Sequence, residues 1–152
     1  MFPFNRTIRS ASEMENLSAE IGAYLIKNFR NSIILLEGEL GAGKTAFCRG
    51  LQKPLGIDDN INSPTFNLLN EYTGRFGILY HYDLYRIQSE QEIIETGFID
   101  LWSEKSDMPA IHAIEWWKKA GNLIPDIFPN YLIQINFSDE YDETRTVHGE
   151  KL

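Results

Sequence analysis

Apolar residues recur at a regular spacing in the N-terminal part of the chain, after a short extended stretch, RTIRS. These residues are Met14, Leu17, Ile21, Leu25 and Phe29. A spacing of three or four positions is the period of a helix with one buried face. Ser10 or Ser12, each followed three residues later by a glutamate, can cap its start. The pattern predicts a helix over residues 11–29.

The next segment, SIILLEG at residues 32–38, is an unbroken apolar run rich in branched side chains. Such a run is typical of a central strand that helices cover on both faces. Residues 44–52 then predict a helix that opens directly from a glycine-rich turn. Pro54 and Gly56 are expected to close this helix.

Shorter apolar runs fill the remainder of the chain. Two strand-like runs, residues 65–72 and 78–83, flank the turn TGRFG and predict an antiparallel hairpin. Helical patterns follow over residues 90–95 and 99–104. Further strands are expected at 110–115, in YLIQINF and in ETRTVH. Since no repeat or linker divides the chain, residues 1–152 are interpreted as one domain.

Composition narrows the range of functions. The chain has 152 residues, 43% of them hydrophobic, which is enough for one substantial core. Neither a membrane span nor a secretory leader is apparent, so a cytoplasmic location is expected. The formal net charge of −8 opposes unassisted binding to a phosphate backbone. The single cysteine, Cys48, is expected to be a core residue.

The strongest chemical signal is GELGAGKT at residues 38–45, which satisfies G-x-x-x-x-G-K-[ST] between a strand and a helix. Glycines let backbone N–H groups approach phosphate oxygens, and the helix start favours an anion. Lys44, expected in a solvent-filled site, would bridge the β- and γ-phosphates, and the Thr45 hydroxyl would bind Mg²⁺. The predicted ATP/ADP-binding residues here are Gly38, Glu39, Leu40, Gly41, Ala42, Gly43, Lys44, Thr45 and Ala46.

Two acidic residues, Asp83 and Glu115, each end a predicted strand. The carboxyl ends of strands in an α/β sheet open onto the crevice that holds such a loop. Either carboxylate can therefore serve a metal or orient water, although a solvated edge or a helix cap explains each position equally well. Trp116 and Trp117 are interpreted as packing residues. His81 and His112, inside apolar strands, are assigned no role.

Several spaced motifs together resemble the TsaE (YjeE) family, the bacterial ATPases of tRNA threonylcarbamoyladenosine biosynthesis. These motifs are GELGAGKT, RGL at 49–51, SPTF at 63–66, NEY at 70–72, YHYDLYR at 80–86 and IEW at 114–116. The sequence departs from the family at Ala46, where a second threonine is common, and at Trp117. Neither change affects a proposed catalytic residue.

The resemblance implies a role for each acidic residue. Glu115 and Thr45 would hold Mg²⁺, and Asp83 would serve the Walker B or water-positioning role. Thr65 would lie in a switch-like segment near the γ-phosphate, and Arg145 would lie near the nucleotide base. The implied fold is a three-layer P-loop NTPase: a mixed, mostly parallel sheet flanked by helices, with an antiparallel hairpin.

The resemblance also implies a function. The protein would hydrolyse ATP with Mg²⁺ and act with TsaD and TsaB in threonylcarbamoylation of adenosine 37, in tRNAs that read codons starting with A. It would meet tRNA through that complex. Slow basal hydrolysis is expected, since no internal arginine finger is obvious. Arg86, beside Asp83, is the internal candidate for such a finger, although a structural ion pair is the favoured interpretation. The alternatives are a small-molecule kinase and a nucleotide-dependent switch, but neither an arginine-rich lid nor N-K-x-D is present.

Overall fold

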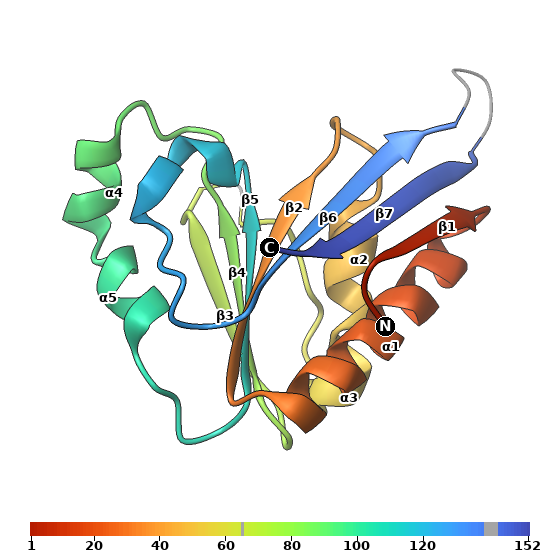
Figure 1. Cartoon of the computed structure of the whole chain (residues 1–152), viewed down its shortest axis with the longest axis horizontal. Helices are drawn as coiled ribbons and strands as arrows, with labels where there is room; N and C mark the ends of the chain where they lie inside the picture. Colours follow the sequence, from red (N-terminus) through yellow and green to blue (C-terminus); the bar gives the residue numbers. More distant parts are fainter. Residues whose placement is uncertain (65, 139–142) are drawn as a thin grey trace.

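A seven-stranded sheet runs through the centre of the protein (Figure 1). The computed structural model describes residues 1–64, 66–138 and 143–152. The strands are β1 (Phe4–Ile8), β2 (Asn31–Glu37), β3 (Leu69–Thr73), β4 (Ile78–Asp83), β5 (Ala110–Glu115), β6 (Asn130–Phe137) and β7 (Arg145–Lys151). Their order across the sheet is β1-β7-β6-β2-β5-β4-β3.

The strands β6, β2, β5 and β4 pair parallel to one another and form the middle of the sheet. The outer pairs, β1 with β7, β7 with β6, and β3 with β4, are antiparallel. Consequently β1 points the same way as the central strands, and only β7 and β3 run against them. The predicted mixed, mostly parallel sheet with a β3–β4 hairpin is confirmed.

Helices cover both faces of the sheet (Figure 1). The helices α1 (Ala11–Asn28), α2 (Lys44–Gly50) and α3 (Gln52–Leu55) cover one face, and α4 (Glu90–Thr96) and α5 (Phe98–Ser103) cover the other. Two 3₁₀ turns, η1 (Trp117–Lys119) and η2 (Gly121–Leu123), follow β5. Among the described residues, no helix is both long and apolar enough to cross a membrane.

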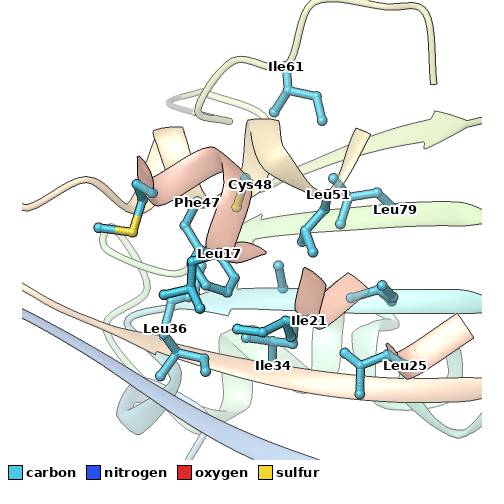
Figure 2. Close-up of a cluster of buried hydrophobic side chains, with 14 of the residues drawn as sticks. Leu17, Ile21, Leu25, Ile34, Leu36, Phe47, Cys48, Leu51, Ile61 and Leu79 are labelled. Atoms are coloured by element: carbon cyan, nitrogen blue, oxygen red, sulfur yellow. The ribbon is translucent and has the colours of Figure 1, made fainter. Parts of the chain in front are cut away.

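Alternation along β2 explains why this strand is apolar throughout. Ile34 and Leu36 join the core under α1–α3, whereas Ile33 and Leu35 join the core under α4 and α5. Successive side chains of a strand point to opposite faces, so a strand covered twice needs apolar residues at every position. Figure 2 shows Ile34 and Leu36 in the first of these cores.

The contact between α1 and α2 is close. A Cβ atom on Gly50 would lie 1.8 Å from Ser18 Oγ and 2.2 Å from the Glu15 carbonyl oxygen. Only glycine permits this approach, which brings α2 against the buried face of α1. Cys48 on α2 is fully buried in the same core, as the sequence predicted (Figure 2).

Two predicted boundaries need correction. The helix expected over 44–52 is divided into α2 and α3, with Pro54 inside α3 and Gly56, at φ +67°, ending it. The strand expected from residue 65 begins only at Leu69. Leu68 adopts φ +59°, a left-handed conformation that an extended strand cannot contain.

Candidate nucleotide site

The glycine loop, residues 38–45, runs from the end of β2 into the first turn of α2. Gly43 adopts φ +119° and precedes the first residue of α2 without any side-chain cap. That φ strongly favours glycine, and the first-turn N–H groups of α2 receive no hydrogen bond from a capping side chain. Within the loop, the Ala42 N–H donates to the Glu39 carbonyl at 3.0 Å. The loop therefore has the compact, glycine-dependent backbone that the motif predicts.

The Lys44 side chain lies along this loop. Its Nζ donates to the carbonyl oxygens of Gly38 at 2.6 Å and Glu39 at 3.1 Å, and the residue is 9% exposed. Lys44 lines the open cavity described below, and the loop folds around its ammonium. The amine thus stands at the wall of the site while it satisfies two backbone acceptors.

A cavity of about 770 Å³ opens beside the loop. Its lining residues are Glu39, Leu40, Gly41, Gly43, Lys44, Thr45, Ser63, Asp83, Tyr85, Arg86, Glu115 and Trp116. The cavity gathers residues from the glycine loop, from the carboxyl ends of β4 and β5, and from the segments that follow those strands. Both acidic residues singled out in the sequence therefore share one cavity with the lysine and the threonine.

Other predicted residues support the loop without lining this cavity. A Cβ atom on Gly38 would lie 2.7 Å from the Ile135 carbonyl oxygen, so glycine is needed for packing on β6. Ala42 is buried, and Ala46 packs against the core beneath α1–α3. Thr65 lies outside the described residues.

Arg145 holds the glycine loop from β7. Its Nε donates to the Ala42 carbonyl oxygen at 3.2 Å, and its guanidinium carbon lies 4.0 Å from the centre of the Phe137 ring. Stacking of this kind fixes the plane of a guanidinium. The structure thus gives Arg145 a contact with the loop backbone; its predicted contact with the base stays a prediction.

Asp83 and Glu115 are neighbours because the β4–β5 register places them directly opposite each other. Asp83 Oδ1 accepts a hydrogen bond from the Tyr85 N–H at 3.0 Å. Burial raises the pKa of Asp83, and the nearby Glu115 carboxylate raises it further. Two adjacent carboxylates facing Lys44 form an electrostatic environment that favours a cation between them.

His81, to which sequence reasoning assigned no role, contacts this acidic pair. Its Nε2 lies 2.8 Å from Glu115 Oε1, and both residues are buried. Burial alone would lower the pKa of His81, but its contacts with Cys48 and Glu115 raise that pKa above its ordinary value. The signal in the sequence was the spacing His81-x-Asp83, which places both side chains on one face of β4.

Trp116 differs from its predicted packing role. It adopts φ +57°, which turns the chain out of β5 directly after Glu115, and its side chain is 42% exposed. Its ring lies 5.1 Å from the Tyr85 ring, centre to centre, and both residues line the cavity. Trp117, in contrast, packs against the core beneath α4 and α5, as expected.

Arg86 also differs from its predicted role. Its guanidinium carbon lies 4.8 Å from the centre of the exposed Phe66 ring. Within the part of the chain that the structure describes, it forms no ion pair. Arg86 is an exposed cation at the cavity wall.

The segment after β5 is fixed to the rest of the site through Glu37. Trp117 Nε1 donates to Glu37 Oε1 at 3.1 Å, and Lys118 Nζ lies 2.8 Å from the same oxygen. Although burial opposes ionisation, the hydrogen bonds from Lys118 and Gln134 hold the pKa of Glu37 below its ordinary value. These contacts border a second cavity of about 430 Å³, which meets the first at Lys44 and Trp116.

The donor set fits a Mg²⁺ ion that is shared with phosphate. Mg²⁺ takes hard oxygen ligands and is usually held by one or two carboxylates together with waters and substrate phosphates. Thr45, Asp83 and Glu115 supply one hydroxyl and two carboxylates around the same cavity. No group of three or more histidine, cysteine or acidic side chains that could hold a metal exists in the described ranges, so a closed, protein-only metal site is not formed there.

The fold and site define a mixed α/β protein that carries a glycine loop at the carboxyl ends of its parallel strands. A family model described as "Threonylcarbamoyl adenosine biosynthesis protein TsaE" matches residues 8–147. The chain belongs to the TsaE family.

Relatives named "tRNA threonylcarbamoyladenosine biosynthesis protein TsaE" match most of the chain. The protein from Rickettsia prowazekii is 40% identical over 95% of this chain and 94% of its own length. The protein from Haemophilus influenzae is 34% identical over 76% of this chain and 67% of its own length. A solved structure, Bacillus subtilis YdiB, superposes with a TM-score of 0.68 at 23% identity over 98% of this chain and 84% of that one. That likeness supports the same fold.

Proposed function

We propose that this protein is a Mg²⁺-dependent P-loop ATPase that serves threonylcarbamoylation of adenosine 37 in tRNAs reading codons that start with A. The observation that carries the proposal is the single cavity in which the glycine loop, Lys44 and Thr45 face Asp83 and Glu115. The pathway is the one named for its relatives. ATP is the substrate and ADP the retained or released product.

Each residue has a proposed task. Backbone N–H groups of the glycine loop bind the phosphates, and Lys44 exchanges its two loop carbonyls for the β- and γ-phosphate oxygens. Thr45 and Glu115 hold Mg²⁺, and Asp83 positions the attacking water or the metal's water shell. When bound, Mg²⁺ neutralises phosphate charge that develops during hydrolysis.

Slow basal turnover is part of the proposal. Lys44 donates to two carbonyl oxygens of its own loop, and these acceptors compete with a phosphate for its ammonium. Arg86, the arginine that lines the cavity, stacks on exposed Phe66. While Arg86 is stacked on Phe66, the isolated protein is expected to lack the roughly 10³- to 10⁵-fold acceleration that a positioned arginine gives. Binding to TsaD and TsaB would supply the missing arrangement.

The partners also resolve a problem of charge. A chain of net charge −8 is repelled by the tRNA backbone, so the TsaD–TsaB complex would provide the basic surface. The protein is therefore proposed to meet tRNA through that complex.

The test measures ATP hydrolysis with Mg²⁺ by the purified protein, alone and with TsaD, TsaB and tRNA. Hydrolysis should rise when the partners are added. Lys44→Ala should lower the stimulated rate by about 10² to 10³-fold, the usual cost of removing one donor to developing charge. Circular dichroism should show that the variant stays folded. Hydrolysis indifferent to the partners would leave an ATPase without this pathway.

A further inference from the structure

The Glu115 carboxylate is held in a position where a free carboxylate would be costly. The residue is 4% exposed, and a buried charge is unfavourable unless it has a partner. The ring nitrogen Nε2 of His81, 2.8 Å from Oε1, is the contact that the structure provides. One carboxylate oxygen of the proposed metal ligand is therefore engaged by a histidine inside the protein.

The strand register brings the histidine to this position. His81 lies directly opposite Ala113, while Asp83 lies opposite Glu115. Alternation directs all four side chains to the same face of the sheet. Because Ala113 is small, the imidazole has lateral space to reach past it toward Glu115. A large residue at 113 would occupy that space.

The other side of the imidazole faces α2. His81 is fully buried, and its Nδ1 has no hydrogen-bond partner among the described residues. Cys48 on α2, also fully buried, lies near enough to raise the pKa of the ring. Cys48 follows Thr45 by three residues, so the two lie on the same side of the helix. The imidazole is thereby located between the helix that carries Thr45 and the strand that carries Glu115, the two proposed sources of metal ligands.

From this arrangement we propose that His81 is a positioning residue for the divalent cation of the bound nucleotide. It holds the Glu115 carboxylate in the orientation in which that group lines the cavity together with Thr45. The inference rests on the proposed function, since it concerns the metal that accompanies ATP. Hydrogen-bond partners of metal-binding carboxylates typically account for about 10- to 100-fold in metal affinity.

The first experiment compares His81→Gln with His81→Leu. Glutamine keeps an N–H that can donate to Glu115, whereas leucine fills the space without a donor. Binding of Mn²⁺, a paramagnetic substitute for Mg²⁺, is measured by electron paramagnetic resonance in the presence of ADP. His81→Leu should weaken Mn²⁺ binding by about 10- to 100-fold, and His81→Gln should stay within a few-fold of the wild type. Equal Mn²⁺ affinity in His81→Leu and the wild type would overturn the proposal.

Controls separate positioning from a general packing defect. Binding of ADP in EDTA should be the same in both variants and the wild type, because the metal-free phosphate contacts do not involve His81. Glu115→Gln tests the underlying function: if it leaves Mn²⁺ affinity unchanged, the metal site itself is wrong. If Glu115→Gln weakens Mn²⁺ binding and His81→Leu does not, the positioning role alone fails.

A second measurement keeps His81 in place, so it does not depend on whether a His81 variant folds. The chain contains three histidines, so ¹⁵N-histidine labelling yields a spectrum with few ring signals. Variants of His112 and His148 identify their signals, and the remainder belongs to His81. Adding Mg²⁺ to the ADP complex should shift the His81 Nε2 resonance and leave the His112 resonance in place. A His81 resonance that does not respond to Mg²⁺ would contradict the inference.

Discussion

His81 and His112 lie on adjacent strands, are both buried, and are both flanked by apolar or aromatic residues. They face opposite sides of the sheet. His81 meets the carboxylate of Glu115, whereas His112 Nδ1 lies 3.0 Å from the neutral hydroxyl of Tyr82. The contacts of His81 raise its pKa, while burial lowers the pKa of His112 to about 4.

The comparison teaches that burial alone does not decide what a histidine does. Both rings lose their water, but only His81 gains a partner of opposite charge, and that partner lines the proposed nucleotide site. The carboxylate partner connects His81 to a proposed metal ligand, whereas the neutral Tyr82 hydroxyl gives His112 a structural contact. Three predictions test this contrast.

The largest effect is expected from removing the carboxylate on the His81 side. Glu115→Ala takes away a proposed metal ligand and leaves His81 without its hydrogen-bond partner. Removing a hydrogen-bond partner of a metal ligand typically lowers metal affinity or activity by about 10- to 100-fold. Loss of the ligand itself should therefore lower Mg²⁺-dependent ATP hydrolysis by more than about 100-fold. Steady-state hydrolysis rates measured over a series of Mg²⁺ concentrations test this.

Glu104→Ala provides the matched control on the His112 side of the sheet, where Glu104 borders a separate cavity. Its hydrolysis rate should equal that of the wild type. An active Glu115→Ala variant with normal Mg²⁺ dependence would remove Glu115 from the metal site.

The second-largest effect is expected from His112, through the dependence of the free energy of unfolding on pH. The pKa of His112 is about 4 in the folded protein, whereas its ordinary value is 6.5. The unfolded chain therefore takes up a proton as pH falls through 6.5, whereas the folded protein takes it up only near 4. His112 should lower the free energy of unfolding by about 3 kcal/mol as pH falls across that window.

Urea unfolding at pH 7 and pH 4 measures this change. The groups that surround His112 are the Tyr82 hydroxyl, the stacked Tyr80 ring, and Glu104, Lys105 and Asp107 around the adjoining cavity. These groups remain in His112→Leu. On acidification, the free energy of unfolding of this variant should therefore fall by about 3 kcal/mol less than that of the wild type. His148→Gln serves as the control for removal of a histidine at a partly exposed position. Identical pH dependence in His112→Leu and the wild type would show that His112 titrates normally.

The smallest effect is expected from Tyr82→Phe. The substitution keeps the buried ring and removes the hydroxyl that contacts His112 Nδ1, so a buried ring nitrogen loses its partner. Unfolding free energy should fall by about 1 to 2 kcal/mol, with ATP hydrolysis unchanged. Chemical denaturation and steady-state kinetics measure the two quantities. Reduced hydrolysis at full stability would instead link the His112 side to the site.

Much of the fold was predictable because its signals are local. The helix over 11–29 and the strands over 32–38 and 110–115 follow from the pattern of apolar residues, and the structure confirms them within a residue or two. The start of β3 was not predictable in this way. Its onset depends on the left-handed conformation of Leu68, which the local pattern of residues does not indicate.

The candidate site was predictable in part. The glycine loop has a sequence signature because backbone geometry and phosphate chemistry require particular residues at fixed spacing. The orientations of Trp116 and Arg86 were misjudged, since each depends on a partner distant in sequence: Tyr85 for the tryptophan and Phe66 for the arginine. Side chains at a cavity wall are oriented by such neighbours.

The sequence by itself determined the family, the glycine loop and the placement of Asp83 and Glu115 at strand ends, because each is written in residue types and short spacings. Only the tertiary structure decided that His81 reaches Glu115 across Ala113 and that Arg145 on β7 reaches the Ala42 carbonyl oxygen. Those contacts depend on strand register and on the depth of burial. Both are set when distant segments pack together, so no local pattern encodes them.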